Sequence, residues 1–437
     1  MGERSIVKWK GHEVELYIER RGDRCLVLNP SNGVWKIYNG SSISCGCANE
    51  FDYEMLTQLD KDGLFSDIVE YADIEHTDEF RLLILEVTKS CNLACTYCFE
   101  GDKPKVYSTM SLKTALKAFE LFADISTFKT IMVEFNGGEA LLNFDLIRQA
   151  VPEIRKAAMD KQIEVKFTLQ SNGTTLTEEI VEFLVREDIP IGISIDGHQE
   201  YNCNRKYKNG EAIDGKLIDN INLLKERGVK FSTLSVLSMK KQYEDIYRLQ
   251  KELGNSTCRI NLLNNVGNGS ANKIGEELIA DLADEFMDFA TKATEDSDAL
   301  YESNLIYHLM GLLLYTPFMC YKTPCGTGYN QLYVNAEGEI YACQEACYVS
   351  KGFLGNVDDG AECVKRRIDA DEWIKSAAMY KEQTPCVKCV WRKLCHVCPA
   401  DYLNDNTSCE FNRRVIPELL WFLNSNQERL LNYIRYQ

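Results

Sequence analysis

The alternation of apolar and polar residues divides the chain into three regions. Between residues 81 and 300, short apolar runs alternate with amphipathic stretches, a pattern typical of repeated strand–helix units. The apolar runs predict strands at residues 82–87, 131–135, 165–169, 189–195, 231–237 and 260–263. The amphipathic stretches predict helices at residues 112–123, 144–159, 178–186, 216–227, 243–253 and 276–293. Six consecutive units predict an α/β fold whose parallel sheet forms a partial (β/α)6, TIM-like barrel rather than a closed eight-unit one.

The region before the barrel has the pattern of a small α+β domain. Its predicted elements are strands at 12–19, 24–28 and 34–38, a turn at 29–33, and an amphipathic helix at 53–64. Pro30 and Gly33 mark the turn, because neither residue suits the interior of a strand. These runs are short, so they predict a domain of mixed sheet and helix rather than a further part of the barrel.

After the barrel, the strand–helix alternation stops and cysteines become frequent. Residues 415–436 carry apolar side chains at helical spacing, which predicts a helix that packs against the rest of the protein. The predicted domains are residues 1–80, 81–300 and 301–437.

Composition narrows the class of protein. The chain has 437 residues and a net charge of -17, which argues against a nucleic-acid partner because such proteins present basic surfaces. It has no apolar signal segment near Met1 and no apolar run long enough to cross a membrane, so we expect a cytoplasmic protein with no membrane partner. In that reducing compartment the 18 cysteines favour metal binding over disulfides. With only 5 histidines, the expected ligands are thiolates, which select zinc or iron–sulfur centres.

Cys91, Cys95 and Cys98 form a C-x3-C-x2-C loop directly after the first predicted barrel strand. Three thiolates leave one iron of a [4Fe–4S] cluster without a protein ligand, and an open coordination position is what a catalytic metal needs. Together with Tyr97 before the third cysteine, this loop resembles that of the radical S-adenosylmethionine (SAM) superfamily. The resemblance implies a radical SAM oxidoreductase that reductively cleaves SAM to a 5′-deoxyadenosyl radical, which then abstracts hydrogen from the substrate.

The second predicted strand ends in Gly137, Gly138 and Glu139. Glycines at a strand end let the backbone approach a ligand closely, although an isolated Gly-Gly-Glu segment is also an ordinary strand–helix turn. Its position one strand after the three-cysteine loop favours binding, and the resemblance implies that these residues hold the amino group of SAM.

Polar residues end the next two strands. By resemblance, Ser171, Asn172 and Ser194 are candidates for the ribose hydroxyls or the carboxylate of SAM, although serine and asparagine are also common helix caps. Arg205 is a candidate partner for the same carboxylate, or alternatively a solvated loop charge.

The C-terminal cysteines resemble a SPASM domain, which carries two further [4Fe–4S] clusters. By this resemblance one cluster is held by Cys320, Cys325, Cys343 and Cys398. The other is held by Cys386, Cys389, Cys395 and Cys409. Two residues separate Cys395 from Cys398 where the family has three, and paired C-x2-C motifs also suit structural zinc. Cys45, Cys47, Cys347 and Cys363 lie outside the pattern.

The resemblance implies three [4Fe–4S] clusters, SAM, and a flavodoxin- or ferredoxin-like electron donor. Residues 1–80 loosely resemble the winged-helix-like element with which peptide maturases bind a leader segment, although the region can also be a structural cap. We therefore expect a ribosomal-peptide maturase of the sactipeptide or ranthipeptide type that installs a thioether crosslink in a precursor peptide.

Alternatives are a carbon–carbon crosslinking maturase, a sulfatase-maturating type of enzyme, and a non-catalytic metal-binding scaffold. Sulfatase maturases have a basic aspartate after the hairpin cysteine, where this chain has Gln344. The general base therefore stays unassigned.

Overall fold

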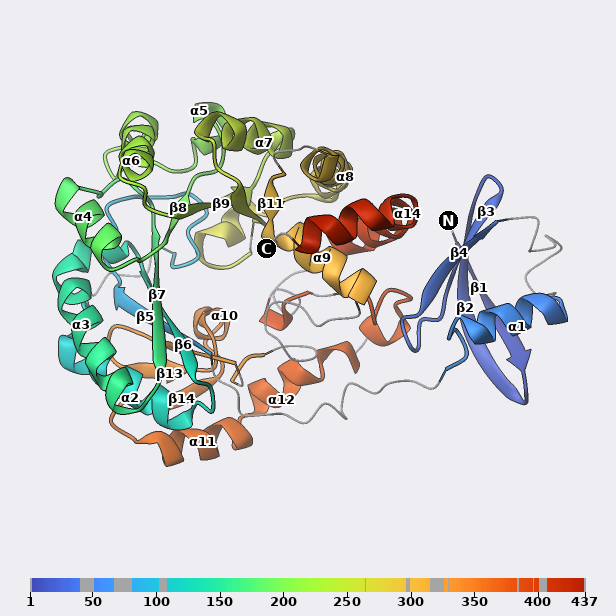
Figure 1. Cartoon of the computed structure of the whole chain (residues 1–437), viewed down its shortest axis with the longest axis horizontal. Coiled ribbons are helices and arrows are strands. Elements are labelled where there is room, and N and C mark those ends of the chain that lie inside the picture. The colour runs from blue at the N-terminus through green and yellow to red at the C-terminus, as the bar shows by residue number, and fades with distance from the viewer. Residues whose placement is uncertain are drawn as a thin grey trace.

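A computed structural model gives the fold, and it describes most of the chain. The described residues are 2–39, 51–66, 81–101, 108–263, 265–295, 299–314, 326–328, 330–382, 385–395, 397–400 and 407–435. They form a large ten-stranded sheet flanked by helices and a separate four-stranded sheet near the N-terminus (Figure 1). Within this described part, no helix is both long enough and apolar enough to cross a bilayer.

The centre of the large sheet is the predicted run of parallel strands. These are β5 (Leu82–Thr88), β6 (Thr130–Gly137), β7 (Glu164–Ser171), β8 (Ile191–Ser194), β9 (Phe231–Leu237) and β10 (Thr257–Leu262), each paired with the next. The helices between them are α2 (Leu112–Ile125), α3 (Phe144–Asp160), α4 (Glu178–Arg186), the short α5 (Gln199–Asn202), α6 (Asp214–Glu226) and α7 (Gln242–Leu253), with α8 (Glu276–Glu295) after β10. The partial barrel predicted from the sequence is confirmed.

Side-chain alternation on the strands separates the two faces of this sheet. On β6, Ile131, Val133 and Phe135 are buried in the core shared with the surrounding helices, while Glu134 and Asn136 alternate with them on the opposite face. The carboxyl ends of all six parallel strands meet at one edge, so the loops that follow β5 to β8 come together there.

The sheet continues beyond the parallel strands at both edges. β12 (Gln331–Val334) pairs in parallel with β5, and β13 (Glu339–Tyr341) and β14 (Phe353–Asn356) extend it as an antiparallel meander. At the other edge, β11 (Tyr301–Glu302) pairs with β10. The C-terminal region therefore shares a hydrogen-bonded sheet with the barrel, so the division proposed at residue 300 is not a break in the sheet.

The remaining C-terminal elements pack around this meander and a second apolar core. Short helices α10 (Gln344–Tyr348), α11 (Ala361–Ala370) and α12 (Glu372–Ala378) follow the hairpin. Helix α14 (Thr407–Arg435) packs against α8 and α9 (Ser303–Leu314) and confirms the predicted tail helix. It begins before the predicted start, and a non-helical residue, Asn426, interrupts its regular geometry.

The N-terminal strands form an antiparallel meander. β1 (Glu3–Trp9), β2 (His12–Arg21), β3 (Arg24–Leu28) and β4 (Trp35–Asn39) lie in sequence order, and Gly33 N donates to Asn29 O at 2.8 Å in the predicted turn. The described residues of this domain include one helix, α1 (Tyr53–Lys61).

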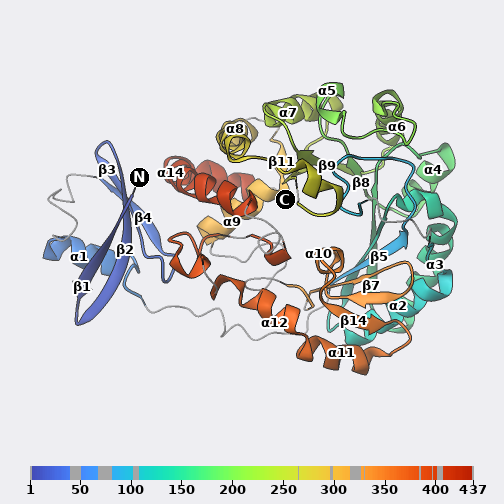
Figure 2. The ribbon, with the colours of Figure 1, turned by 180° about the vertical axis from the view of Figure 1, so that it is seen from behind.

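The N-terminal sheet has packed residues on both faces, although the outer face of β1 is exposed. Leu16 and Ile18 pack with Leu59 of α1 on one face, and Leu26 and Leu28 pack into the core that contains α14 on the other. Figure 2 shows the sheet beside α14, a helix from the other end of the chain.

Candidate active site

The three-cysteine loop begins directly after β5, at the edge where the parallel strands end. Cys91, Cys95 and Cys98 are half-buried, and their thiols are close enough to affect one another electrostatically. Burial, reinforced by the neighbouring thiols, raises the pKa of Cys91 to about 12, and burial also raises the pKa of Cys98. Thiols in such a place ionise only beside a compensating positive charge, which a metal centre supplies. The three side chains therefore fit a cluster site.

The loop is clamped to the segment that follows β8. Ala94 N donates to Lys206 O at 2.9 Å, and the Thr96 hydroxyl donates to Asn204 Oδ1 at 2.7 Å. On the other side, Asn268 N donates to Cys98 O at 2.9 Å. Contacts from two distant segments therefore fix the path of the cysteine loop before any ligand binds.

Arg205, Asp196 and Tyr97 form a buried polar cluster beside this loop. Arg205 Nε donates to Asp196 Oδ2 at 3.0 Å, and the Tyr97 hydroxyl donates to the same oxygen. Burial raises the pKa of Tyr97 well above its ordinary value, and for Arg205 the Asp196 carboxylate outweighs burial and raises the pKa. With 7% of its surface exposed, Arg205 is not the solvated loop charge that was one of its two sequence interpretations.

Asp196 is a residue of this site that the sequence interpretation did not name as a candidate. Besides Arg205 and Tyr97, its side chain accepts from Val236 N at 2.9 Å, and its backbone oxygen accepts from Gln242 Nε2 at 2.9 Å. An aspartate followed by Gly197 at a strand end was a visible signal, although nothing in the sequence named its partners.

Gly137 and Gly138 bring the end of β6 against the end of β5. Gly138 N donates to Thr88 O at 2.9 Å. A Cβ atom at Gly137 would lie 2.3 Å from Thr88 O, and one at Gly138 would lie 2.6 Å from Ser90 O. Glycine is therefore required here for close packing of two backbones, whatever ligand binds beside them.

The Glu139 carboxylate ties together the ends of β6 and β7. It accepts from Asn172 N at 2.7 Å, from the Ser171 hydroxyl at 2.8 Å, and from Leu141 N and Thr175 Oγ1 at 3.2 and 3.3 Å. Burial raises its pKa despite these donors. Four donors match the acceptor capacity of a carboxylate, so contact with the amino group of SAM, which stays a prediction, requires Glu139 to exchange a partner.

The other polar candidates lie at the same strand ends. Asn172 Nδ2 donates to Asn92 Oδ1 at 2.8 Å and approaches Cys91 Sγ at 3.9 Å, so Asn172 touches the cysteine loop. Ser194 ends β8 and is half-buried, two positions before Asp196. The structure thus brings all seven candidate SAM-contacting residues to the edge that carries the three cysteines, while their contacts with SAM stay predictions.

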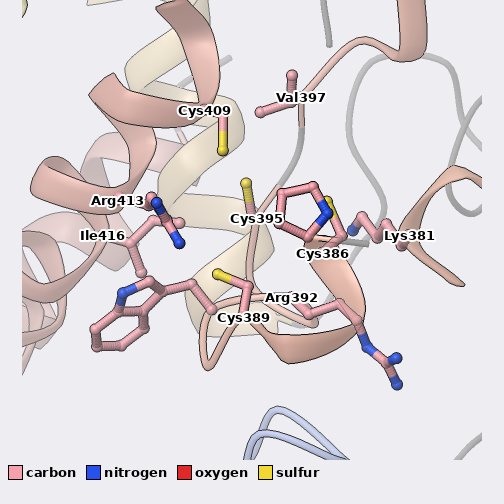
Figure 3. Close-up of a pocket in the computed structure, with 11 residues that line it drawn as sticks. Lys381, Cys386, Cys389, Arg392, Cys395, Val397, Cys409, Arg413 and Ile416 are labelled. Carbon is pink, nitrogen blue, oxygen red and sulfur yellow. The ribbon is translucent and has the colours of Figure 1, made fainter. Parts of the chain in front are cut away.

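Four C-terminal cysteines surround one pocket, which we call the four-cysteine pocket (Figure 3). Cys386, Cys389 and Cys395 come from the loop around residues 385–395, and Cys409 comes from the first turns of α14. Burial raises the pKa of Cys395 to about 12 and that of Cys409 to about 11. Four thiols around one pocket fit the predicted cluster in number and type of ligand.

Three cations, Lys381, Arg392 and Arg413, also line this pocket. Burial lowers the pKa of Lys381 to about 8, although the Cys395 and Cys386 thiols oppose this shift. Burial of Arg413 likewise opposes its charge, but a hydrogen bond to Cys389 and the nearby thiols raise its pKa overall. Across the described residues, no three His, Cys, Asp or Glu side chains converge closely enough to hold a single metal ion.

The other predicted cluster set is only partly within the described residues. Cys320 and Cys325 lie outside them, as do Cys45 and Cys47. Cys343 is buried at the start of α10, where its sulfur accepts from Ala346 N at 3.3 Å, and Cys398 is half-buried. The assignment of Cys320, Cys325, Cys343 and Cys398 to one cluster therefore stays a prediction.

The cysteines outside both cluster patterns differ in exposure. Cys25 and Cys258 are buried, as expected for small apolar side chains, whereas Cys203 is exposed. Cys347 and Cys363 are half-buried. The described structure gives no reason to place any of these five in a metal site.

A family model and several known proteins match this chain in sequence. The family model of the Radical SAM superfamily matches residues 85–253, from β5 to the end of α7. A cysteine-type anaerobic sulfatase-maturating enzyme of Clostridium perfringens is 27% identical over 344 residues, 72% of this chain and 87% of that enzyme. An uncharacterized protein of Methanocaldococcus jannaschii is 34% identical over 163 residues, 37% of this chain and 55% of that protein. The chain thus spans only about half the length of this second relative.

Solved structures share the fold. The sulfatase-maturating enzyme anSMEcpe with bound AdoMet and the Cp18Cys peptide has a TM-score of 0.65 at 22% identity, covering 79% of this chain and 99% of that one. SuiB of Streptococcus suis bound to its precursor peptide SuiA has a TM-score of 0.56 at 14% identity, covering 93% of this chain and 98% of that one. Residues 85–253 of this chain thus match the Radical SAM superfamily, and over most of its length the chain is similar to a sulfatase-maturating enzyme.

Proposed function

We propose that this protein is a radical SAM enzyme that modifies a ribosomally made precursor peptide. The observation that carries the proposal is the convergence of the Cys91–Cys95–Cys98 loop with the ends of β6, β7 and β8 at one sheet edge. This arrangement combines an open metal site with polar groups that can orient a charged cofactor. When bound, SAM and its iron–sulfur cluster would supply the radical that removes a hydrogen atom from the substrate.

The residues of this chain would bind the cluster and orient SAM. The three thiolates would hold the cluster, the backbone at Gly137 and Gly138 would face the amino group of SAM, and Asn172 would lie against the cluster loop. The buried Arg205–Asp196 pair would keep the loop after β8 in place while the substrate enters. Burial of these groups would exclude water from the reactive centre.

The proposed partner is a precursor peptide with a leader segment, and the proposed leader site is the N-terminal sheet. Its edge strands, β1 and β4, are where an extended peptide could add as another strand. SuiB is a relative of the same fold whose structure contains its precursor peptide. Division of the chain into leader-binding, radical SAM and SPASM parts at residues 1–80, 81–300 and 301–437 is part of this proposal.

Thioether formation is the preferred reaction, with carbon–carbon crosslinking as its alternative. Sulfatase maturation is a second candidate because a relative covering 72% of this chain is a sulfatase-maturating enzyme. Against it, Gln344 stands after the hairpin Cys343, and its amide donates to the Tyr348 hydroxyl at 2.8 Å. An amide does not accept a proton at neutral pH, so this position lacks a general base.

The test uses the full chain, reconstituted anaerobically with iron and sulfide, and supplied with SAM, a flavodoxin- or ferredoxin-type donor and the precursor encoded beside its gene. We expect 5′-deoxyadenosine, a precursor that has lost two hydrogen atoms by mass spectrometry, and a precursor cysteine that no longer alkylates. The same mass loss with every cysteine still alkylatable would favour a carbon–carbon bond. Conversion of a sulfatase-derived peptide with no change in the precursor would favour sulfatase maturation.

The control separates an enzyme from a metal-binding scaffold. Joint substitution of Cys91, Cys95 and Cys98 by alanine should abolish SAM cleavage, whereas Cys203→Ala removes an exposed cysteine outside the motif and should have no effect. Cleavage that survives the triple substitution would rule out the proposed site. Iron bound without any SAM cleavage by the native chain would support the scaffold instead.

A further inference from the structure

The inner face of the barrel carries two opposite charges that the proposed SAM site does not use. Glu134 lies on β6 and Arg259 lies on β10, and both side chains are half-buried. Their neighbours along the strands, Val133 and Phe135 on β6 and Ile260 on β10, are buried in the cores that contain the surrounding helices. Because side chains alternate along a strand, Glu134 and Arg259 point to the opposite face, into the barrel.

These two side chains act on each other across the barrel. Four strand spacings separate β6 from β10, which would be roughly 19 Å in a flat sheet. Salt largely screens the effect of one charge on another over such a distance. Burial raises the pKa of Glu134, and the Asn136 amide and the Arg259 charge both oppose this shift. The curvature of the sheet therefore brings Arg259 much nearer to Glu134 than their separation along the sheet.

Neutral amides orient both groups. Asn136 Nδ2 donates to Glu134 Oε1 at 3.0 Å, and Asn136 Oδ1 accepts from Gly137 N at 2.7 Å. Arg259 Nε donates to Asn261 Oδ1 at 3.2 Å. Glu134 and Arg259 act on each other through space and form no direct ion pair with each other. A group of the substrate could therefore lie between them and contact both.

Two more carboxylates lie near this pair, but both are already engaged. The Arg259 charge also acts on Glu302, whose carboxylate accepts from three backbone N–H groups and which is only 1% exposed. Glu86 has an inner-face position on β5, but it is 3% exposed and accepts from Ala336 N at 3.1 Å. The half-buried Glu134 is therefore the most accessible of these three carboxylates.

The inner face around the pair is polar, unlike the aliphatic filling of a packed barrel. Ser194 and Arg259 both stand opposite Leu234 of β9, so Arg259 lies in register with a candidate SAM contact. An inner face of this kind suits a polar substrate beside the SAM site. Five neutral polar residues share it: Asn136, Thr168, Gln170, Ser194 and Asn261.

We propose that Glu134 and Arg259 bind an extended stretch of substrate backbone inside the barrel, with Glu134 accepting from a peptide N–H and Arg259 donating to a peptide C=O. The proposal rests on the proposed function for the substrate being a peptide. The N–H and C=O of a trans peptide bond point to opposite sides of an extended chain, so groups on opposite walls can meet both. Hydrogen bonds to charged groups are stronger than neutral ones, so the pair would fix the position of the chain without selecting a residue type.

The test measures peptide binding without turnover. The full chain is reconstituted with iron and sulfide and saturated with SAM, but it receives no electron donor. The probe is a fluorescein-labelled synthetic core segment, without its leader, of the precursor encoded beside the gene. Fluorescence anisotropy gives the affinity of each variant for this probe.

The variants remove the two charged groups one at a time. Glu134→Met and Arg259→Met each remove one proposed hydrogen-bond partner, whereas Glu134→Gln removes the charge and keeps an acceptor. The matched controls are Glu164→Gln and Lys166→Gln. These residues lie on the same face at the amino end of β7, 3.5 Å from each other, and their side chains are 60% and 58% exposed.

We expect Glu134→Met and Arg259→Met each to weaken probe binding about tenfold, the effect of losing a hydrogen bond to a charged group. Glu134→Gln should fall between Glu134→Met and the native chain. The two controls should bind the probe as the native chain does. Affinity for SAM, measured by isothermal titration, should stay unchanged in every variant, which separates peptide binding from misfolding.

An ester scan of the probe tests the backbone contact itself. Each peptide bond is replaced in turn by an ester, which removes one N–H group and leaves every side chain in place. One ester should weaken binding to the native chain about tenfold, because it removes the donor to Glu134. The same ester should cost nothing further in Glu134→Met.

Two results would overturn the proposal. One is native affinity for the probe in both methionine variants. The other is weaker binding in these variants without any effect of an ester on the native chain, because the pair would then bind a side chain rather than the backbone. A native chain that binds neither the probe nor the whole precursor would contradict the proposed function, and this assignment with it.

Discussion

Arg205 and Asp196 form an ion pair at 3.0 Å, with only 8% and 1% of their side chains exposed. Tyr97, inside the three-cysteine loop, donates to the same carboxylate. The pair therefore links the loop after β8 to the proposed cluster site. Such a buried pair is costly to break, because the remaining charge stays buried without compensation.

Asp196→Asn should lower the free energy of unfolding by about 3–5 kcal/mol, because it leaves Arg205 buried beside a neutral amide. Urea unfolding measures this loss, and isothermal titration of the reconstituted protein with SAM should show weaker binding. Asp188→Asn is the control, since Asp188 is 83% exposed and its pair with Lys230 should contribute less than about 1 kcal/mol. Equal stability of the Asp196 and Asp188 variants would contradict a role for the buried pair.

Gly137→Ala should prevent the end of β6 from meeting β5. The new methyl group would lie 2.3 Å from Thr88 O, and the backbone φ of +141° is itself unfavourable for alanine. We expect loss of SAM binding and lower iron retention, measured by calorimetry and iron analysis. Gly215→Ala in α6 meets open space and should instead stabilise the protein by about 0.5–1 kcal/mol. Normal SAM binding by the Gly137 variant would mean that glycine is not required where the end of β6 meets β5.

Trp421→Ala should loosen the N-terminal sheet from α14. Trp421 Nε1 donates to Glu19 Oε1 at 3.0 Å, and the Arg21 guanidinium lies 5.0 Å from the indole ring. Replacing a buried tryptophan costs about 3–5 kcal/mol, so amide hydrogen exchange should accelerate in β2 and β3. Arg24→Ala removes a cation–π contact at 5.3 Å and a 3.4 Å hydrogen bond to the Ser425 hydroxyl, both exposed, and should change exchange little. Unchanged exchange in the Trp421 variant would mean that other contacts hold this sheet.

Much of the barrel could be predicted from the sequence because short apolar runs mark its strands and its helices are amphipathic. The predicted limits of β9 and α4 agree with the structure, and the others differ by a few residues at their ends. Strands β12 to β14 could not be assigned to this sheet, because each has only three or four residues. Their parallel pairing with β5 is a long-range contact without a local sequence signal. β1 escaped prediction although it alternates, with Ile6 exposed on its outer side.

The resemblance to the SPASM domain grouped Cys386, Cys389, Cys395 and Cys409, which the structure places around one pocket, whereas the other predicted set stays a prediction. That resemblance did not reveal the groups around them. Lys381 and Arg413 reach the four-cysteine pocket from separate elements, and Asp196 gathers its partners from four segments. Such neighbours depend on tertiary packing, which residue spacing does not encode.

The pH dependence of stability should contain a contribution from Glu302, which lies buried directly before α9. Burial raises its pKa from 4.5 to about 7, against the effect of backbone donors such as Leu305 N. The unfolded chain loses this proton near pH 4.5 while the folded chain keeps it, so stability falls as pH rises toward 7. The loss is about 3 kcal/mol, and Glu302→Gln should remove it, as measured by urea unfolding between pH 4.5 and 7.

His308 in α9 should oppose that contribution over nearly the same range. Burial lowers its pKa from 6.5 to about 4, so the unfolded chain gains a proton that the folded chain excludes, and stability falls as pH drops from 6.5 toward 4. In the native chain the two slopes cancel between about pH 4.5 and 6.5. Each single variant should reveal the titration of the other group. Relative to the native chain, Glu302→Gln should lose stability as the pH falls toward about 4.5, and His308→Asn should lose stability as the pH rises toward about 6.5. Profiles for both variants that run parallel to that of the native chain would contradict the buried states assigned to these two groups.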